Sequence, residues 1–218
     1  MTSREFKERL SRRARKARVQ LPSEMLAPYE TYFRLLAQWN VKVNLTGLSL
    51  QPPTDETFDR LFIEPLAAST LVTDAPGLWF DLGSGGGSPA FPLKLVRPSL
   101  GLTLVESKAR KAAFLREVVR VLKLPATDVA NVRFEELESD ATRSADLVTV
   151  RAVRPDAVLF KVSARLLKEG GRLLLFGKPG SKLHPHDFER EGLPIGTEAV
   201  AGRILTSYLR VFHVEQSR

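Results

Sequence analysis

The chain of 218 residues contains no cysteine and only three histidines, His184, His186 and His213. Without cysteine it forms no disulfide and no thiolate-ligated metal site, and the composition suits a reducing cytoplasm. The histidines are too few and too unevenly placed for a zinc site, so we expect no metal. Histidine and cysteine at the spacing of a catalytic triad are also lacking.

No apolar run approaches the roughly 20 residues that a membrane helix needs, and the N-terminus lacks the apolar segment of a signal peptide. We therefore expect a soluble cytoplasmic protein without membrane contact. An organellar transit peptide is an alternative, since residues 4–18 are rich in arginine, but Glu5 and Glu8 argue against it. With 43% hydrophobic and 27% charged residues, the chain can form one substantial core.

Positive charge is concentrated at the N-terminus. Residues 1–20, the basic arm, hold eight basic and two acidic side chains and so carry +6 of the formal net charge of +8. Such a stripe ahead of a nearly neutral body is typical of contact with a nucleic-acid backbone, because neutralised phosphates release counterions. A solvated helix face or a frayed terminus would explain the same charges. The candidate nucleic-acid contacts in this arm are Arg12, Arg13, Arg15 and Lys16.

From residue 77 onward, short apolar segments alternate with helical patterns. The expected strands lie within residues 77–83, 100–107, 129–138, 145–153 and 171–178. The expected helices lie within residues 93–98, 108–124 and 157–169. This alternation indicates parallel strands joined by right-handed crossovers, an open α/β sheet covered on both faces. Residues 202–216 should add one or two closing strands.

The first third of the chain has a helical pattern instead. Apolar and aromatic residues recur at spacings of three and four in residues 27–40, which predicts an amphipathic helix. Thr54 or Asp55 should cap a second helix. We therefore divide the chain into residues 1–74, a basic arm and N-terminal helical region packed on the core, and residues 75–218, the domain that contains the sheet.

A glycine-rich loop separates the first expected strand from its helix in LWFDLGSGGGSPAFPLKLVRP, residues 78–98. In an open parallel sheet, ligands bind at the carboxyl ends of the strands, which is where this loop lies. Gly83, Gly85 and Gly87 permit positive φ and let a ligand approach the backbone. Such a loop alone is a weak signal, because plain turns and several nucleotide-binding families contain one.

Glu106 makes the signal more specific. It ends the second expected strand about 20 residues after the loop, where a carboxylate can accept hydrogen bonds from both ribose hydroxyls of an adenosine compound. Alternatively, Glu106 only caps the next helix. No lysine follows the glycines, which disfavours ATP and GTP. NAD stays open, but Asp81 would place a carboxylate near its pyrophosphate and suits the ammonium of S-adenosylmethionine better.

Five segments of the chain resemble the RsmG (GidB) family of bacterial 16S ribosomal RNA methyltransferases: LLAQWNVKVNLTG, FDLGSGGGSPAFPLKLVRP, LVESKARKAAFL, RFEELE and VTVRAV. The resemblance spans about residues 29–178. It implies a Rossmann-like class I S-adenosylmethionine-dependent methyltransferase sheet with an N-terminal helical extension. It also implies S-adenosyl-L-methionine as cofactor and methyl transfer to guanine N7 of 16S rRNA, at position 527 in the family's rRNA numbering.

The resemblance further implies roles for individual residues. Gly83 and Ser88 would contact the cofactor, Phe134 and Glu135 would hold its adenine, and Arg151 would lie beside it. Arg151 could instead be a surface arginine paired with Asp81 or Asp146, and Phe134 could be a core residue. The candidate cofactor contacts are Asp81, Gly83, Gly85, Ser88, Glu106, Phe134, Glu135 and Arg151.

Guanine N7 carries an in-plane lone pair and no proton, so methyl transfer to it needs positioning but no general base. We therefore expect no acid–base catalytic residue, and Arg151 and Lys178 are candidates to hold guanine O6 or nearby phosphates. Asn40 and Asn44 are expected to be structural. Further candidate RNA contacts are Lys108, Arg110 and Lys111.

The sequence departs from the family pattern at Phe62, Glu64, Pro65, Ser88 and Ala90. Because the cofactor motifs are kept, these changes bear on the exact RNA target more than on the cofactor. Two other functions stay open: a methyltransferase of the same fold acting on a small molecule or protein, and a nonenzymatic RNA-binding protein with a vestigial cofactor pocket. The substrate would be 16S rRNA or the small ribosomal subunit, and we expect a monomer.

Overall fold

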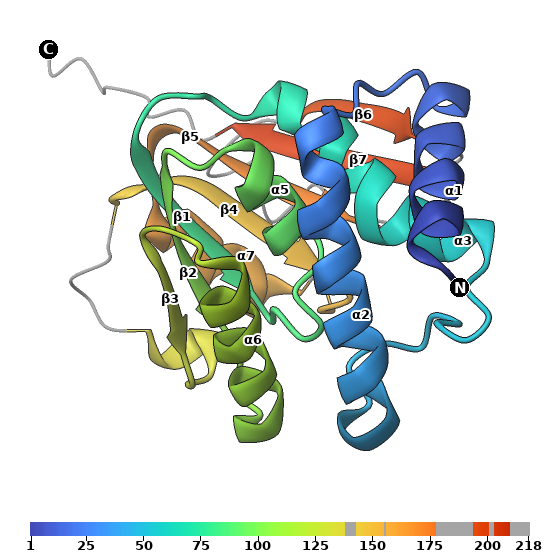
Figure 1. Cartoon of the computed structure of the whole chain (residues 1–218). Coiled ribbons are helices and arrows are strands. Elements are labelled where there is room, and N and C mark those ends of the chain that lie inside the picture. Colours follow the sequence, from blue (N-terminus) through green and yellow to red (C-terminus); the bar gives the residue numbers. More distant parts are fainter. Residues whose placement is uncertain (138–142, 155, 178–193, 201–202, 210–218) are drawn as a thin grey trace, which may run out of the picture.

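A seven-stranded sheet of order β3-β2-β1-β4-β5-β7-β6 forms the centre of the molecule (Figure 1). The computed structural model describes residues 1–137, 143–154, 156–177, 194–200 and 203–209, the last two ranges as backbone only. The strands are β1 (Gly77–Leu82), β2 (Leu100–Val105), β3 (Thr127–Ala130), β4 (Ala145–Arg151), β5 (Leu167–Phe176), β6 (Pro194–Val200) and β7 (Arg203–Leu209). The first five are parallel, while β7 is antiparallel to both β5 and β6.

The order of the strands reverses at β1. From β1 the chain continues outward through β2 to β3, and it then returns to β4 on the other side of β1. At such a reversal the connections after the two neighbouring strands lead to opposite faces, which opens a crevice at their carboxyl ends. The predicted α/β sheet is thus confirmed, and the glycine-rich loop after β1 lies at this crevice.

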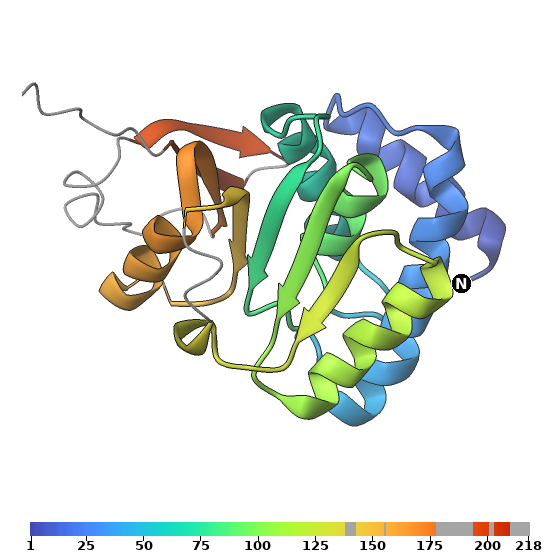
Figure 2. The same ribbon diagram turned by 90° about the vertical axis from the view of Figure 1, so that its left-hand side faces the viewer.

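Helices cover both faces of the sheet (Figure 2). The larger apolar core lies on one face, under the N-terminal helices, α5 and α6, and a smaller core lies on the other face under α7 and η4. The larger-core helices are α1 (Ser3–Lys16), α2 (Leu26–Val43), α5 (Ala90–Val96) and α6 (Ala109–Leu122), with the short η1 (Ser23–Met25) and η3 (Ser69–Leu71). On the other face are α7 (Ala157–Leu166) and η4 (Phe134–Glu136).

Between α2 and the sheet, residues 55–68 form one continuous helical run. It consists of α3 (Asp55–Phe58), the π-helical turn η2 (Asp59–Ile63) and α4 (Glu64–Ala68). Phe62 in this run is fully buried, with its ring centroid 5.2 Å from that of Tyr29 and 5.7 Å from that of Phe6. Aromatic contacts at these distances stabilise packing beyond the area they bury. The run therefore joins α1 and α2 to the core.

The basic arm is an ordered helix, so the alternative of a frayed terminus is wrong. Phe6, Leu10 and Ala14 recur every four residues along α1 and are buried. Thr2 and Glu5 form a capping box at its start, which satisfies backbone N–H groups that have no partner within the helix. One face of α1 thus packs on the core and the other faces solvent.

Two predicted boundaries are wrong. The third strand was expected within residues 129–138, but β3 spans Thr127–Ala130 and its pairing with β2 ends at Ala130. The helix expected within residues 157–169 ends at Leu166, because Leu167 adopts extended geometry and pairs with Ala145 of β4. Local propensity did not reveal this pairing, which depends on a strand distant in the sequence.

Candidate functional site

Residues 83–88 form the glycine-rich loop that follows β1. Gly83 and Gly87 have φ of 72° and 83°. A Cβ added to Gly83 would lie 2.5 Å from Cγ2 of Val153, and one added to Gly87 would lie 2.3 Å from the ring of Phe91. Only glycine suits both this backbone conformation and this space.

Gly85 is required for a different reason. Its φ is 50°, and a Cβ added here would make only ordinary van der Waals contacts, 3.7 Å from Gly83 O and 4.0 Å from Leu45 O. Because Gly85 lines the cavity, its missing side chain leaves the backbone open as a cradle for part of a ligand. The Gly85 N–H donates a 2.9 Å hydrogen bond to Oε2 of Glu106, which holds the loop in place.

The loop forms one wall of a cavity of about 660 Å³, a size usual for small-molecule sites. The opposite wall comes from α2 and from residues 45–49, and the helical run 55–68 contributes Arg60 and Leu61. Of the candidate site residues, the cavity is lined by Gly83, Gly85, Ser88, Glu106, Lys111 and Arg151. Residues from five separate segments thus meet at the carboxyl edge of the sheet.

Sequence reasoning missed that residues 45–49 line the cavity. Asn40 holds this segment: its Oδ1 accepts hydrogen bonds from the N–H groups of Leu45 and Thr46, at 2.7 and 2.9 Å, and its Nδ2 donates to Thr46 O. Asn44 ends α2 in the left-handed conformation, with φ of 52°. The structural roles predicted for Asn40 and Asn44 are confirmed. The signal available in the sequence was Asn40 and Asn44 at the end of the predicted helix, because such side chains can bind the backbone that follows.

Glu106 lies at the carboxyl end of β2, as predicted, and its side chain is buried. One carboxylate oxygen accepts the Gly85 N–H, and the other accepts the N–H of Lys108, the N-cap residue of α6, at 2.8 Å. Glu106 therefore lines the cavity and also ties the loop to α6. The contact with Lys108 agrees with the alternative that Glu106 caps the next helix, and its contact with a ribose stays a prediction.

Asp81 lies beneath the loop and is not among the residues that line the cavity. Its buried carboxylate accepts a 2.5 Å hydrogen bond from the hydroxyl of Thr149 on β4, and that hydroxyl accepts one from Nε1 of Trp79. Burial raises the pKa of Asp81 to about 6. Asp81 is therefore a charged group below the cavity floor rather than part of its surface.

Arg151 ends β4, and its side chain is 9% exposed. Its Nη2 donates to Oε2 of Glu64 at 2.8 Å, and its Nη1 donates to Arg60 O and, at 3.4 Å, to the hydroxyl of Ser88. The guanidinium carbon lies 4.7 Å from the centroid of the Phe176 ring. Burial lowers the pKa of Arg151 to about 10, which still leaves it charged at neutral pH.

The alternative that Arg151 is a surface arginine paired with Asp81 or Asp146 is wrong. Its ion pair is with Glu64, whereas Asp146 accepts from the N–H of Leu78 and pairs with Lys168 at the opposite edge of the sheet. Ala90 is fully buried as the first residue of α5, so its methyl group fits into the core.

Phe134 and Glu135 lie in η4, after β3. Phe134 is half-buried and packs against the smaller core, while Glu135 is exposed. Neither is among the residues that line the cavity, so their contact with an adenine ring stays a prediction. Lys178 lies outside the described residues.

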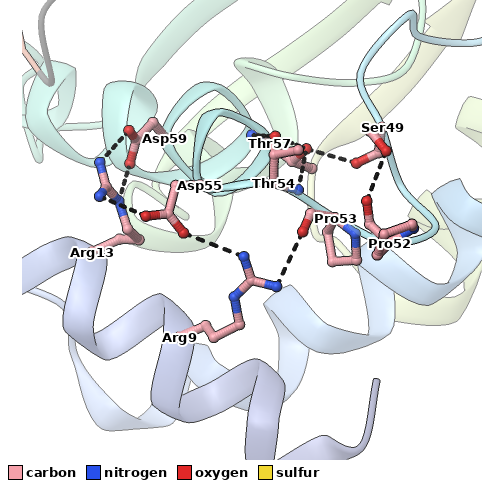
Figure 3. A network of polar contacts seen from close by, with 9 residues as sticks. All are labelled: Arg9, Arg13, Ser49, Pro52, Pro53, Thr54, Asp55, Thr57 and Asp59. Atoms are coloured by element: carbon pink, nitrogen blue, oxygen red, sulfur yellow. Dashed lines mark hydrogen bonds and ion pairs between the residues drawn. The ribbon is translucent and has the colours of Figure 1, made fainter.

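Five of the candidate RNA contacts are exposed to solvent and two, Lys111 and Arg13, are partly buried. Arg12, Arg15 and Lys16 are exposed on α1, and Lys108 and Arg110 are exposed at the start of α6. Lys111 is half-buried and lines the cavity. Arg13 is 12% exposed and is held by Asp55 and Asp59 (Figure 3), so its charge is largely neutralised within the chain.

The contacts of Arg13 belong to a network that joins α1 to residues 49–59, which lie beside the cavity (Figure 3). Arg9 donates to Pro53 O at 3.1 Å and to Asp55 at 3.2 Å. Within residues 49–59, the Thr57 hydroxyl donates a hydrogen bond to Ser49 O at 2.7 Å. Ser49 lines the cavity, so α1 helps to hold one of its walls.

No group of three or more His, Cys, Asp or Glu side chains able to bind a metal occurs in the part of the chain that the structure describes. Among the same residues, no helix has the length and apolarity needed to cross a bilayer.

Comparison with known proteins places this geometry in a family. Residues 25–183 match the family model described as rRNA small subunit methyltransferase G. A protein of that name from Roseiflexus castenholzii is 36% identical over 158 residues, which cover 72% of this chain and 66% of the relative. Another from Xanthomonas euvesicatoria is 37% identical over 178 residues, covering 81% of this chain and 77% of the relative.

Solved structures agree in fold. Pyrococcus horikoshii TYW2 in complex with MeSAdo has a TM-score of 0.55 at 15% identity, covering 69% of this chain and 62% of that chain. A 16S rRNA (adenine-N1)-methyltransferase from Catenulisporales acidiphilia has a TM-score of 0.52 at 13% identity, covering 71% of this chain and 93% of that chain. These similarities confirm the predicted methyltransferase sheet.

Proposed function

The chain belongs to the rRNA small subunit methyltransferase G family, and we propose that it transfers a methyl group from S-adenosylmethionine to guanine N7 of 16S rRNA. The observation that carries this proposal is the cavity at the strand reversal, where the glycine-rich loop and Glu106 meet. The family supports the cofactor and the RNA substrate, and the lining of the cavity supports the choice of several site residues.

The residues around the cavity fit S-adenosylmethionine. Gly85 lines the cavity without a side chain, so a ligand group can approach its backbone, and Glu106 offers carboxylate oxygens at the distance along the chain that suits a ribose. The buried charge of Asp81 below the floor favours the cationic end of the cofactor, and Lys111 suits its carboxylate. Arg151, whose charge is paired with Glu64, lines the cavity beside the cofactor. Phe134 and Glu135 remain our candidates for the adenine.

S-adenosylmethionine, when bound, supplies a methyl group on a sulfonium sulfur that acts as leaving group. Guanine N7 attacks without losing a proton, so the protein has to bring the base into line and exclude competing water. Arg151 is the described residue best placed to orient the base, because its guanidinium is held rigidly in the cavity wall. Lys178 remains a second candidate.

The substrate side is proposed from charge. Arg12, Arg15 and Lys16 on α1 and Lys108 and Arg110 on α6 are exposed cations on helices that border the cavity segments. Unpaired RNA bases are reached most easily in loops, where phosphates flank the target on both sides. We infer that these cations hold the RNA backbone, that the protein works as a monomer, and that it acts in the cytoplasm.

The proposal is tested by incubating the protein with methyl-labelled S-adenosylmethionine and small ribosomal subunits from a strain that lacks this modification. Label in the 16S rRNA is the expected result. Label only in protein or small molecules would indicate another acceptor for the same fold. RNA binding that needs no cofactor, with no transfer, would indicate a nonenzymatic RNA-binding protein.

A further inference from the structure

The helical run 55–68 changes its hydrogen-bond spacing next to the cavity. Within η2 the Glu64 N–H donates to Asp59 O, five residues back rather than four. The next residue, Pro65, has no N–H to donate. The backbone ladder is therefore interrupted at this point of the run.

The interruption affects two identifiable carbonyl groups. Residue 65 would donate to Arg60 O in π spacing and to Leu61 O in α spacing. With proline at position 65, neither bond can form. A carbonyl without a donor is costly where water is excluded, so the carbonyl that loses this bond requires another partner.

Side chains from two other segments supply these donors. The Ser88 hydroxyl lies 3.1 Å from Leu61 O and 3.3 Å from Arg60 O. Nη1 of Arg151 donates to Arg60 O, and it also lies 3.4 Å from the Ser88 oxygen. The Ser88 hydroxyl thus donates to the run and accepts from Arg151 at the same time.

We propose that Pro65 and Ser88 act together as positioning residues for Arg151. Pro65 leaves carbonyl acceptors free on the helical run, and Ser88 and Arg151 bind them, which fixes the guanidinium in the cavity wall. Ser88, Arg60, Leu61 and Arg151 all line the cavity. The proposal rests on the proposed function in one respect, namely that the position of Arg151 matters for cofactor binding.

The test is a double-mutant cycle on the full chain, with wild type, Ser88→Ala, Pro65→Ala and the double variant. The dissociation constant of S-adenosylmethionine is measured by calorimetry well below the unfolding temperature. Ser88→Ala should weaken binding about tenfold, the usual effect of losing one buried hydrogen bond. In the Pro65→Ala background, a backbone N–H is available again, so the same change should weaken binding less than about threefold.

Conservative variants separate positioning from packing. Ser88→Thr keeps the hydroxyl and should retain affinity for S-adenosylmethionine. Ser88→Val has nearly the same shape as the threonine variant but no hydroxyl, and it should lose this affinity. Ser99→Ala is a matched control, since the Ser99 hydroxyl also donates to a carbonyl, Asp74 O, but is exposed and does not line the cavity. It should leave affinity unchanged.

Additive effects of the Ser88 and Pro65 changes, or equal affinities of the Thr and Val variants, would overturn the proposal. Urea unfolding of the same four proteins gives a second measurement that does not depend on the cofactor. If the wild type binds no S-adenosylmethionine, the proposed function fails, and coupling between Ser88 and Pro65 in the unfolding midpoint still decides whether the two residues act together. No coupling there overturns the inference as well.

Discussion

The guanidinium of Arg13 holds the carboxylate of Asp59 through two hydrogen bonds, of 2.8 Å from Nε and 2.5 Å from Nη2. Asp59 is the first residue of η2, so this ion pair fastens α1 to one end of the helical run 55–68. Arg151 contacts Arg60 and Glu64 farther along the same run. The run is thus held from the basic arm on one side and from the cavity on the other.

Arg13→Ala should lower the free energy of unfolding by about 2–4 kcal/mol, because it leaves the buried Asp59 carboxylate without its partner. Arg12→Ala is the control: Arg12 is exposed on the same helix, and its removal should change stability by less than about 0.5 kcal/mol. Urea unfolding followed by circular dichroism measures both. Similar losses in the two variants would show that the Arg13 contacts do not stabilise the fold.

Removal of the exposed cations Arg12, Arg15 and Lys16 should weaken RNA binding and its dependence on salt. Each phosphate contact contributes about −0.7 to the slope of log affinity against log salt for single strands, so the triple alanine variant should reduce the slope by about 2. Filter binding to a 16S rRNA fragment at several salt concentrations measures this. An unchanged slope would mean that α1 does not contact the RNA.

Gly85 and Gly87 should respond differently to alanine. At Gly87 the new Cβ would overlap the Phe91 ring at positive φ, and stability should fall by about 3 kcal/mol or more. At Gly85 the Cβ makes only ordinary contacts, so stability should fall by only about 1–2 kcal/mol, while affinity for S-adenosylmethionine falls at least tenfold. Thermal unfolding and calorimetric titration of both variants check this contrast, and normal affinity in Gly85→Ala would argue against the cofactor cradle.

Asp81 should make stability depend on pH. Burial raises its pKa from 3.8 to about 6 in the folded chain. The folded protein therefore binds this proton more tightly than the unfolded chain, and the resulting stabilisation is present below about pH 4 and is lost as the pH rises through about 6. Asp81→Asn keeps an acceptor for Thr149 without this titration.

The unfolding free energy of Asp81→Asn relative to the wild type should therefore increase between pH 4 and pH 7.5, by at most about 3 kcal/mol. Other carboxylates titrate in both proteins, so their contributions cancel in the difference. Urea unfolding at four pH values within this range measures it. A difference that stays constant or decreases with pH would contradict the assigned environment of Asp81.

The sheet and its glycine-rich loop could be predicted because their signals are local. Apolar strands alternate with amphipathic helices from residue 77 onward, and Gly83 and Gly87 occupy positions where backbone conformation and space both require glycine. Glu106 was predictable from its distance to the loop. The family resemblance rested on these same segments and is confirmed by the family match.

Other features depend on contacts between distant segments, which a single sequence does not encode locally. Arg12 and Arg13 are neighbours of the same residue type, yet only Arg13 faces Asp55 and Asp59, more than 40 residues away. Asp81 was placed at the end of the correct strand, but Thr149 on β4 holds its side chain below the loop. The end of α7 was missed because it depends on the pairing of Leu167 with β4.

The central claim is that the cavity beside Gly85 binds the methyl donor for guanine N7 of 16S rRNA. Small subunits treated with S-adenosylmethionine and either the wild type or Gly85→Val are digested to nucleosides, which are separated and identified by mass spectrometry. The account predicts one 7-methylguanosine per 16S rRNA with the wild type and a strong loss of it with Gly85→Val, at a temperature where circular dichroism shows that the variant is folded. Methylation of a different base or atom, or full activity of Gly85→Val, would contradict it.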